Sequence, residues 1–259
     1  DHEWCEFFKS ENFLVGVSLD LKRECHNGAR VDSAGNGTFD KVLASLDLLR
    51  EHDVNFNILC TLTDELAGYP KRVWDLIVRQ DFRYVQFTPC MDGLEGCNGY
   101  GLTPRRFAEF YKDLFDRWYG DLKEGRVRSI KMFDDIANLL LFNIKTACGI
   151  DGHCMPQIIA EADGSVYPCD FYCLDEYKVG NLNEEDILTV FDKAGSSMTK
   201  EFAPPEKCRT CRFMAICGGN CKRMRKNICF ADPGTDYCGY KDLLEYIGPR
   251  LYSLGKNLQ

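Results

Sequence analysis

The feature that most constrains this chain is a group of cysteines in its second half. The chain has 259 residues and 15 cysteines, and ten of the cysteines follow residue 147. Eight of the ten form an ordered series: C-x5-C, then G-x4-C beginning at Gly164, then C-x2-C-x5-C-x3-C, and one distant cysteine. These eight are Cys148, Cys154, Cys169, Cys208, Cys211, Cys217, Cys221 and Cys238. Eight thiolates can supply two sites of four ligands, the number that a [4Fe-4S] cluster takes.

Four-thiolate sites can also hold zinc, so the metal stays open at this point. Gly218 and Gly219 favour iron–sulfur clusters, because glycine lets backbone amides approach sulfide closely. The additional thiols of Cys173 and Cys229 fit a reduced, anaerobic setting. Disulfides are the least favoured interpretation, because the cysteine count is odd and C-x2-C groups in a chain of this kind typically bind metals.

The charge of the chain disfavours two classes of partner. A net charge of −8 and an isoelectric point near 5.1 would repel nucleic acid and anionic membranes. The basic run KRMRKN at 222–227 is an exception, and we interpret it as cations that offset thiolate and cluster charge. Neither an apolar stretch of roughly 20 residues nor a signal sequence is present. We therefore expect a cytoplasmic protein without a membrane or nucleic-acid partner.

The first part of the chain alternates between strand-like and helix-like patterns. Apolar and β-branched runs predict four strands, at residues 13–20, 56–63, 84–90 and 127–133. Apolar residues recur at helical spacing after Phe39 and again after the capping pair Thr103-Pro104. Such alternation predicts an α/β fold with a parallel sheet and right-handed crossovers. Four strands make half of a TIM-type (β/α)8 barrel.

Beyond residue 147 the pattern changes. The sequence predicts a β-hairpin over 158–169 that turns at Asp163-Gly164, a short helix over 184–193 and a closing helix over 240–254. We place a domain boundary at this change. The predicted domains are a partial barrel over 1–147 and a cysteine-rich cluster domain over 148–259.

The cysteine series resembles the SPASM domain of radical S-adenosylmethionine enzymes. The phrases FLVGVSLD, NFNILC, DGSVYPCDF and CRTC…CGGNC are most similar to the anaerobic sulfatase-maturating enzymes, and the resemblance runs through essentially the whole chain. It implies two auxiliary [4Fe-4S] clusters that act as electron carriers. The cluster nearer the active site would be held by Cys148, Cys154, Cys169 and Cys221. The outer cluster would be held by Cys208, Cys211, Cys217 and Cys238.

The resemblance also implies a reaction, in which a Cys or Ser of a sulfatase becomes Cα-formylglycine. A 5′-deoxyadenosyl radical takes a hydrogen from the substrate Cβ, a base takes the thiol or hydroxyl proton, and an electron leaves through the auxiliary clusters. Asp170 matches the proposed base, and a partly desolvated carboxylate beside a cluster is suited to accept a proton. The structural alternative is an aspartate that caps the turn.

Several residues of the partial barrel match cofactor or substrate positions of that family. They are Ser18, Asp20, Arg30 and Met91, with Gln86 and Thr88 as further candidates. Barrel active sites form at the carboxyl ends of the strands, where these residues are expected. The structural alternatives are a cap for Asp20, a surface salt bridge for Arg30 and a core position for Met91. His26 is more simply a hydrogen-bonded loop residue than a ligand.

Two departures from the family pattern stand out. The motif C-x3-C-x2-C is absent, since Cys169 and Cys173 are followed by Glu176 where a third cysteine is needed. S-adenosylmethionine and a third [4Fe-4S] cluster would therefore require an N-terminal segment that precedes Asp1, and we expect the chain alone to be inactive. Secondly, Leu21-Lys22 replaces the usual Gly-Pro after Asp20, which predicts a different cofactor-side loop.

The leading hypothesis is thus the C-terminal part of an anaerobic sulfatase maturase, a radical S-adenosylmethionine oxidoreductase. Its partners would be a sulfatase polypeptide and a reducing electron carrier such as flavodoxin or ferredoxin. Three alternatives stay open: another peptide-modifying enzyme with a SPASM domain, a non-catalytic module that binds clusters, and a domain that zinc stabilises.

Overall fold

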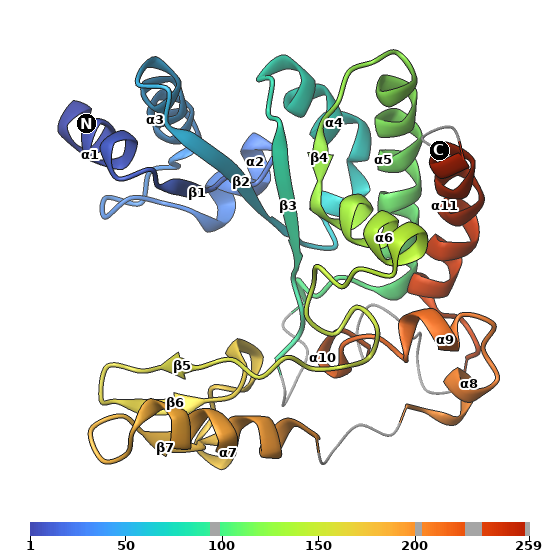
Figure 1. Ribbon diagram of the computed structural model, residues 1–259. Coiled ribbons are helices and arrows are strands. Elements are labelled where there is room, and N and C mark those ends of the chain that lie inside the picture. Colours follow the sequence, from blue (N-terminus) through green and yellow to red (C-terminus); the bar gives the residue numbers. More distant parts are fainter. Residues whose placement is uncertain (94–98, 200–203, 226–234, 257–259) are drawn as a thin grey trace. The chain divides into compact units, whose positions relative to one another are not determined.

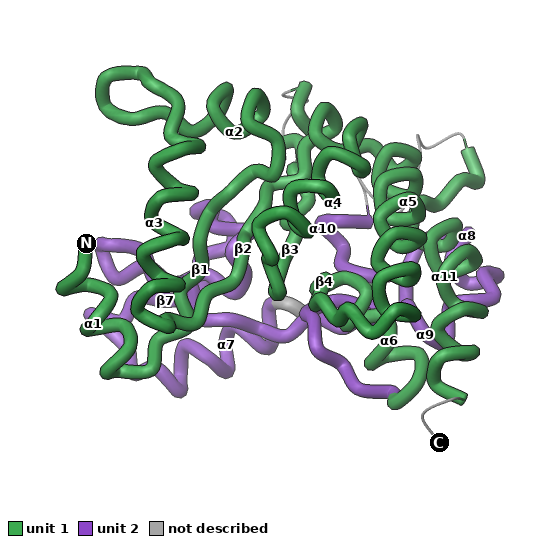
Figure 2. Tube along the Cα trace, turned by 90° about the horizontal axis from the view of Figure 1, so that it is seen from above, with its two compact units in different colours: residues 1–142, 227–259 green, residues 143–226 purple. Residues whose placement is uncertain are grey.

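The computed structural model describes residues 1–93, 99–199, 204–225 and 235–256. The chain forms two compact units, coloured separately in Figure 2. Unit 1 comprises residues 1–142 and 227–259, and unit 2 comprises residues 143–226. Cys229 and the end of the basic run at 226–227 lie outside the described residues. Within the described part of the chain, no helix combines the length and the apolar character that crossing a bilayer requires.

Unit 1 is built on a parallel sheet of four strands in the order β1-β2-β3-β4 (Figure 1). The strands are β1 (Leu14–Ser18), β2 (Asn55–Leu62), β3 (Tyr84–Pro89) and β4 (Ser129–Ile130). Leu14 pairs with Asn55, Ile58 with Val85, and Tyr84 with Ser129. All neighbours are parallel and consecutive in sequence, so each connection is a crossover. The predicted partial barrel is confirmed in these strands.

Helices precede β1 and follow each strand, and they line the outer side of the curved sheet (Figures 1 and 2). They are α1 (His2–Ser10), α2 (Arg23–Ala29), α3 (Phe39–Glu51), α4 (Pro70–Arg79), α5 (Pro104–Lys123) and α6 (Lys131–Phe142), with a 3-10 turn η1 (Leu66–Gly68). The predicted cap of α5 is present, because the Thr103 hydroxyl oxygen accepts the N–H of Arg106 at 3.3 Å. Proline follows at the first helical position, where its missing N–H costs nothing.

The two faces of the sheet differ sharply, because side chains alternate along each strand. One face carries Ile58, Cys60, Val85 and Phe87, which are buried against the helices. The aromatic face of α5 completes this core: the rings of Phe115 and Trp118 of α5 each lie 5.3 Å from that of Phe133 of α6, measured between centroids. The other face is exposed or half-buried and carries polar side chains.

The closing helix α11 (Gly239–Lys256) belongs to unit 1 rather than to the cysteine-rich unit. It packs against α5 and α6, and its Leu244 and Ile247 are buried. Lys112 of α5 forms an ion pair with Asp242 at 2.5 Å. The compact units therefore differ from the predicted domains of 1–147 and 148–259, because α11 has an apolar face that unit 1 buries.

Unit 2 has little regular structure. Its strands β5 (Ile159–Ala160), β6 (Ser165–Tyr167) and β7 (Gly180–Asn181) form an antiparallel sheet. The predicted turn is present, since Gly164 has φ +82° and the N–H of Glu161 donates to Ser165 at 2.8 Å. The other elements are η2 (Asp170–Tyr172), η3 (Asp175–Tyr177), α7 (Ile187–Thr199), α8 (Glu206–Arg209), α9 (Met214–Cys217) and α10 (Lys222–Met224).

One predicted strand is wrong over most of its length. The run 127–133 contributes only Ser129–Ile130 to the sheet, and the chain turns into α6 at Lys131. Apolar side chains then recur at helical spacing, with Phe133, Ile136 and Leu139 buried. The helical period of the following residues overrides the strand-like start.

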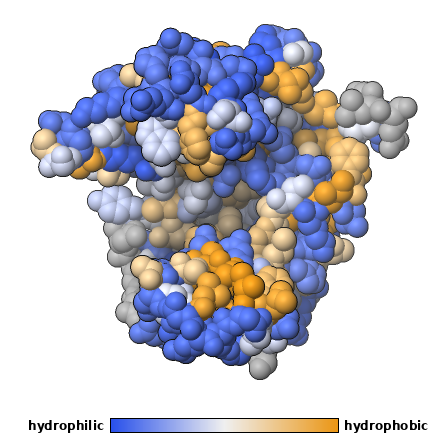
Figure 3. Space-filling model, turned by 60° about the vertical axis from the view of Figure 1, so that its left-hand side comes forward, coloured by the Kyte–Doolittle hydropathy of each residue, from blue (hydrophilic) through white to orange (hydrophobic). Residues whose placement is uncertain are grey.

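Apolar side chains gather on the surface of unit 2 (Figure 3). Ile187, Leu188 and Phe191 of α7 are exposed, together with Leu182 just before it. Val190 and Ala194 of the same helix are buried. Helix α7 is therefore apolar on more than the face it buries within unit 2.

Candidate cluster site and barrel surface

Unit 2 brings four predicted cluster ligands together from three separate segments. Cys148 and Cys154 lie in the loop before β5, Cys169 follows β6, and Cys221 precedes α10. Gly149 packs so tightly against Cys221 that a Cβ on this glycine would lie 2.8 Å from the Cys221 Cβ. The Cys148 sulfur accepts the N–H of Met155 at 3.4 Å. The 148–155 loop is thus folded back against the start of α10.

The thiols of this set lie near enough to influence one another's pKa. Burial raises the pKa of Cys154 to about 11, and the neighbouring Cys221 and Cys148 raise it too. Lys222 and Arg225 act in the opposite direction on the same thiol. Burial likewise raises the pKa of Cys169 to about 12, with Cys221 among its neighbours. The thiols of Cys154 and Cys169 are therefore protonated at neutral pH in the metal-free chain, and ligation by these two would release protons.

The spacing of the thiols bears on the metals that they could hold. In a tetrahedral zinc site the sulfurs lie about 3.8 Å apart, because each Zn–S bond is about 2.3 Å long. Among the described residues, no three cysteine sulfurs lie within 4.8 Å of one another; His2, Glu51 and His52 at the surface of unit 1 do form such a group. A [4Fe-4S] cube holds its ligands farther apart, since each binds a different iron. The four cysteines of unit 2 match the number of thiolates that such a cluster takes.

Gly218 and Gly219 have a packing role within unit 2. The expectation that they let amides approach sulfide stays a prediction; in this structure a Cβ on Gly218 would lie 1.9 Å from the carbonyl oxygen of Asp151. Gly218, Gly219 and Asn220 all have positive φ, so the chain reverses sharply between Cys217 and Cys221. The glycines thereby allow the 149–152 loop to pack against this reversal.

The outer thiols lie on short helical turns. The N–H of Cys211 donates to the carbonyl of Cys208 at 3.0 Å, and the N–H of Cys217 donates to Phe213 at 2.8 Å. Cys208 is buried, whereas Cys211 and Cys217 are half-buried. The fourth predicted ligand, Cys238, belongs to unit 1 and directly precedes α11, where its sulfur accepts the N–H of Lys241 at 3.4 Å.

Asp170 directly follows Cys169 at the start of η2. The thiol of Cys169 lies 3.5 Å from its Oδ1. The sequence suggested a partly desolvated carboxylate, but Asp170 is exposed. It therefore lies beside a candidate cluster ligand and remains accessible to solvent within unit 2.

On the barrel side, the structure joins two of the predicted residues directly. The Arg30 Nε donates to Asp20 Oδ2 at 2.9 Å, and the Thr61 N–H donates to Asp20 Oδ1 at 2.9 Å. Asp20 is buried. Ser18 is exposed at the end of β1, and Met91 is half-buried just beyond β3. Asp20 and Arg30 therefore form a fixed ion pair next to the carboxyl ends of the strands.

His26 is connected by hydrogen bonds to the backbones of both residues of this ion pair, which the sequence did not reveal. The backbone N–H of Asp20 donates to the Nδ1 of His26 at 3.2 Å. The Nε2 of His26 therefore carries the hydrogen and points at the Thr38 hydroxyl, 3.1 Å away. That hydroxyl donates in turn to the carbonyl of Arg30 at 3.0 Å. Burial lowers the pKa of His26, which matches a neutral imidazole. Leu21, the departure from the family pattern, is buried and is not among the described residues with positive φ.

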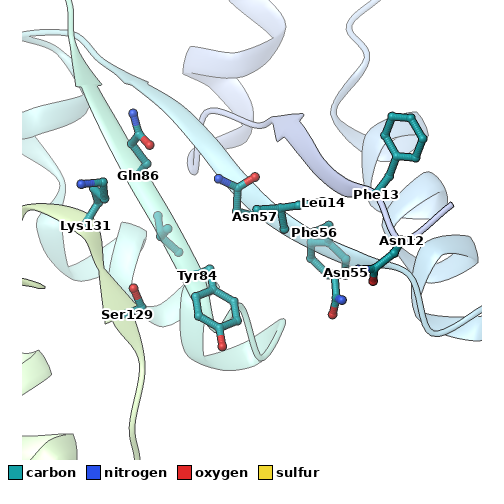
Figure 4. A pocket seen from close by; sticks show the side chains of 11 residues that line it. Asn12, Phe13, Leu14, Asn55, Phe56, Asn57, Tyr84, Gln86, Ser129 and Lys131 are labelled. Carbon is teal, nitrogen blue, oxygen red and sulfur yellow. The ribbon is translucent and has the colours of Figure 1, made fainter. Parts of the chain in front are cut away.

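The open face of the sheet forms a trough of about 490 Å³ at the amino-terminal halves of the strands (Figure 4). Its polar side chains include those of Asn57, Gln86, Ser129 and Lys131 from β2, β3, β4 and α6, with Asn12 and Asn55. Tyr84 and Leu14 line it as well. Of the residues predicted for the barrel, only Gln86 is part of this trough; Ser18, Asp20 and Met91 lie toward the opposite ends of the strands.

The comparisons with known proteins agree with these features. A family model described as an iron–sulfur cluster-binding domain, SPASM, matches residues 154–212. The chain is 36% identical over 266 residues to the cysteine-type anaerobic sulfatase-maturating enzyme of Clostridium perfringens (strain 13 / Type A), covering 100% of this chain and 72% of that protein. It is 28% identical over 280 residues to the serine-type anaerobic sulfatase-maturating enzyme of Bacteroides thetaiotaomicron, covering 99% and 67%.

A solved structure gives the same result. The chain is similar to native anSMEcpe with bound AdoMet and Cp18Cys peptide, with a TM-score of 0.89, 34% identity, and coverage of 100% of this chain and 74% of that one. The predicted α/β fold, a partial barrel followed by a SPASM domain, is confirmed by this match. From its sequence and its fold, the chain belongs to the radical S-adenosylmethionine family of anaerobic sulfatase-maturating enzymes.

Proposed function

We propose that this chain is part of an anaerobic sulfatase maturase that oxidises a Cys or Ser of a sulfatase to Cα-formylglycine. The observation that carries the proposal is the meeting of Cys148, Cys154, Cys169 and Cys221 in unit 2. Family membership supports the reaction, since both cysteine-type and serine-type maturases are relatives. Which of the two residues is the substrate stays open within the proposal.

Two ligand sets follow from this function. Cys148, Cys154, Cys169 and Cys221 would hold one auxiliary [4Fe-4S] cluster, and Cys208, Cys211, Cys217 and Cys238 would hold the second. When bound, the clusters would supply a route for the electron that substrate oxidation releases. Lys222 and Arg225 act on the first set by offsetting the negative charge of its thiolates, as their effect on the pKa of Cys154 indicates.

Asp170 would accept the proton of the substrate thiol or hydroxyl. Its support is positional: the carboxylate follows a ligand of the first set and is exposed, so an incoming peptide can reach it. A general base can take up a proton only if the donor comes within hydrogen-bond reach. Because Asp170 lies beside Cys169, the substrate thiol or hydroxyl would have to approach this cluster ligand closely.

The barrel would contribute to the binding of S-adenosylmethionine through Ser18, Asp20, Arg30 and Met91. The third [4Fe-4S] cluster of the reaction needs a C-x3-C-x2-C motif, which the 259 residues do not contain. Arg30 is held by Asp20 and Thr61, so its guanidinium is oriented before any ligand arrives. Preorganisation of this kind reduces the entropy cost of binding.

The proposed function implies two partners. A sulfatase polypeptide would be the substrate, and a solved relative contains a bound peptide. An electron carrier such as flavodoxin or ferredoxin would exchange electrons with the enzyme.

The decisive experiment measures iron and acid-labile sulfide after anaerobic reconstitution of the chain. We expect about eight irons and eight sulfides per chain, and a loss of about half in Cys148→Ala and again in Cys208→Ala. Cys173→Ala is the matched control, because this thiol belongs to neither set and should leave both contents unchanged. Stoichiometric zinc without labile sulfide would overturn the proposal.

A further inference from the structure

The region around the outer thiols has a charge opposite to that of the rest of the chain. Between Pro204 and Arg225 six side chains are basic and one is acidic, whereas the whole chain has a net charge of −8. Cations near thiolates can serve two purposes: they can stabilise the site internally, or they can attract a partner from solution. Burial distinguishes these purposes.

Three of the six cations act internally. Arg223 and Arg225 are buried. Arg225 donates from Nε to the carbonyl of Gly219 at 2.6 Å and from Nη2 to that of Asn220 at 3.0 Å, so it holds the reversal before Cys221. The Lys222 ammonium lies 4.5 Å from the centre of the Tyr172 ring and acts on Cys154.

The other three, Lys207, Arg209 and Arg212, alternate with the outer thiols on and after α8, and we call them the α8 cation patch. Arg209 and Arg212 are exposed and Lys207 is half-buried. Arg209 lies 3.2 Å from Glu206, but these side chains are 58% and 83% exposed, so the pair is weak and can exchange partners. The Arg212 guanidinium lies 4.9 Å from the centre of the Phe213 ring. The patch thus presents positive charge at the surface next to Cys208 and Cys211.

We propose that the α8 cation patch docks a small electron-carrier protein with an acidic surface, which takes one electron from the outer cluster. The inference rests on the proposed function, because it needs an outer cluster that carries electrons. In the transfer the outer cluster is oxidised by one electron and the redox group of the carrier is reduced by one. No bond to the substrate forms or breaks at this surface.

The chemistry of the patch favours this partner over nucleic acid. Three cations within six residues make a small site, whereas the remaining surface is acidic and would repel an extended polyanion. Electron-carrier complexes have small, transient interfaces, and complementary charge mainly speeds their encounter. The expected complex is therefore weak and strongly dependent on salt.

The test measures the affinity of the reconstituted chain for an acidic flavodoxin at about 20 mM and about 300 mM sodium chloride, a range that shortens the screening length severalfold. The variant Lys207→Glu/Arg209→Glu/Arg212→Glu removes the patch. A matched control, Lys71→Glu/Arg72→Glu/Arg79→Glu in α4, changes the net charge by the same amount at exposed positions of unit 1. Electron transfer from the reduced clusters to oxidised flavodoxin, followed as semiquinone formation, is the second readout.

We expect the patch variant to lower the affinity and the bimolecular transfer rate at low salt by about tenfold or more, and the control to change them by less than about threefold. High salt should remove the difference between parent and patch variant. The single variant Arg209→Glu, at a largely exposed side chain, should show the same trend if the triple variant loses iron.

Equal losses in the two triple variants would overturn the proposal, because net charge alone would then explain the binding. Tighter salt-dependent binding of a 20-base-pair DNA duplex than of flavodoxin would overturn it as well. Iron and labile-sulfide contents decide the proposed function separately, whereas the difference between the patch and control variants decides the docking surface.

Discussion

At the scale of single residues, the fold of unit 2 depends on the backbone conformation of its glycines as well as on its thiols. Gly218 has φ +52°, and a Cβ there would meet the backbone of Asp151 at 1.9 Å, which no side-chain movement can relieve. We expect Gly218→Ala to lower the free energy of unfolding by roughly 2 kcal/mol or more and to reduce the iron bound per chain.

A matched control exists in α5. Gly120 lies inside the helix, and a Cβ at this position would have nothing within 4 Å, so Gly120→Ala should stabilise the chain by roughly 0.5–1 kcal/mol. Urea unfolding and iron analysis measure both variants. A Gly218→Ala chain as stable as the parent would contradict the close approach of the two loops.

His26 predicts a pH dependence of stability. Burial lowers its pKa in the folded chain, so below about pH 6.5 the unfolded chain binds a proton that the folded chain does not. Proton binding then stabilises the unfolded state relative to the native state, so the free energy of unfolding falls as the pH decreases from about 7.5 to about 5.5. His26→Gln should reduce this slope. Urea unfolding at both pH values measures it, and identical slopes in parent and His26→Gln would refute the assignment.

At the scale of elements, the sequence predicted the strands and helices of unit 1 well, because their hydrophobic periods are long. It failed at residues 127–133, because a short apolar run fits a strand and a helix equally. In the structure only Ser129 and Ile130 pair with β3, and α6 begins at Lys131. It also did not reveal β7, since Gly180–Asn181 is too short to have a period. The two ligand sets come from the family resemblance and stay a prediction. The pairing of Asp20 with Arg30 could not be predicted, because it depends on how α2 returns toward β2.

The placement of α11 on unit 1 leads to a prediction about that element. Ile247 is fully buried in the packing of α11, whereas Tyr252 on the same helix is 47% exposed. Ile247→Ala should therefore destabilise unit 1 by about 2–5 kcal/mol through lost packing and a cavity, and Tyr252→Ala should cost less than about 1 kcal/mol. Thermal unfolding followed by near-ultraviolet circular dichroism compares the two. Equal effects would mean that α11 does not contribute to the core of unit 1.

At the scale of the whole molecule, the two units are stabilised in different ways. Unit 1 has a continuous aromatic and aliphatic core between its sheet and helices. Unit 2 has strands of only two or three residues and few buried apolar side chains, among them Val166, Tyr167 and Val190. A unit with so small a core usually depends on metals or cross-links, and its described cysteines are thiols rather than disulfides. Cluster binding should therefore be part of the folding free energy of unit 2.

Removal of the clusters tests this difference within one molecule. In hydrogen-exchange mass spectrometry, the metal-free chain should lose protection across 143–199 and 204–225, while β1 to β3 and α5 stay as protected as in the reconstituted chain. The physical reason is that metal ligation closes loops in unit 2 that its small core cannot hold, whereas unit 1 retains its core. Cys154→Ala should reproduce the loss around 148–169 in the presence of iron and sulfide, and Cys25→Ala in unit 1 is the matched control. Equal protection of unit 2 with and without clusters would show that its fold is complete before the metal binds, and that the thiols converge for chemistry alone.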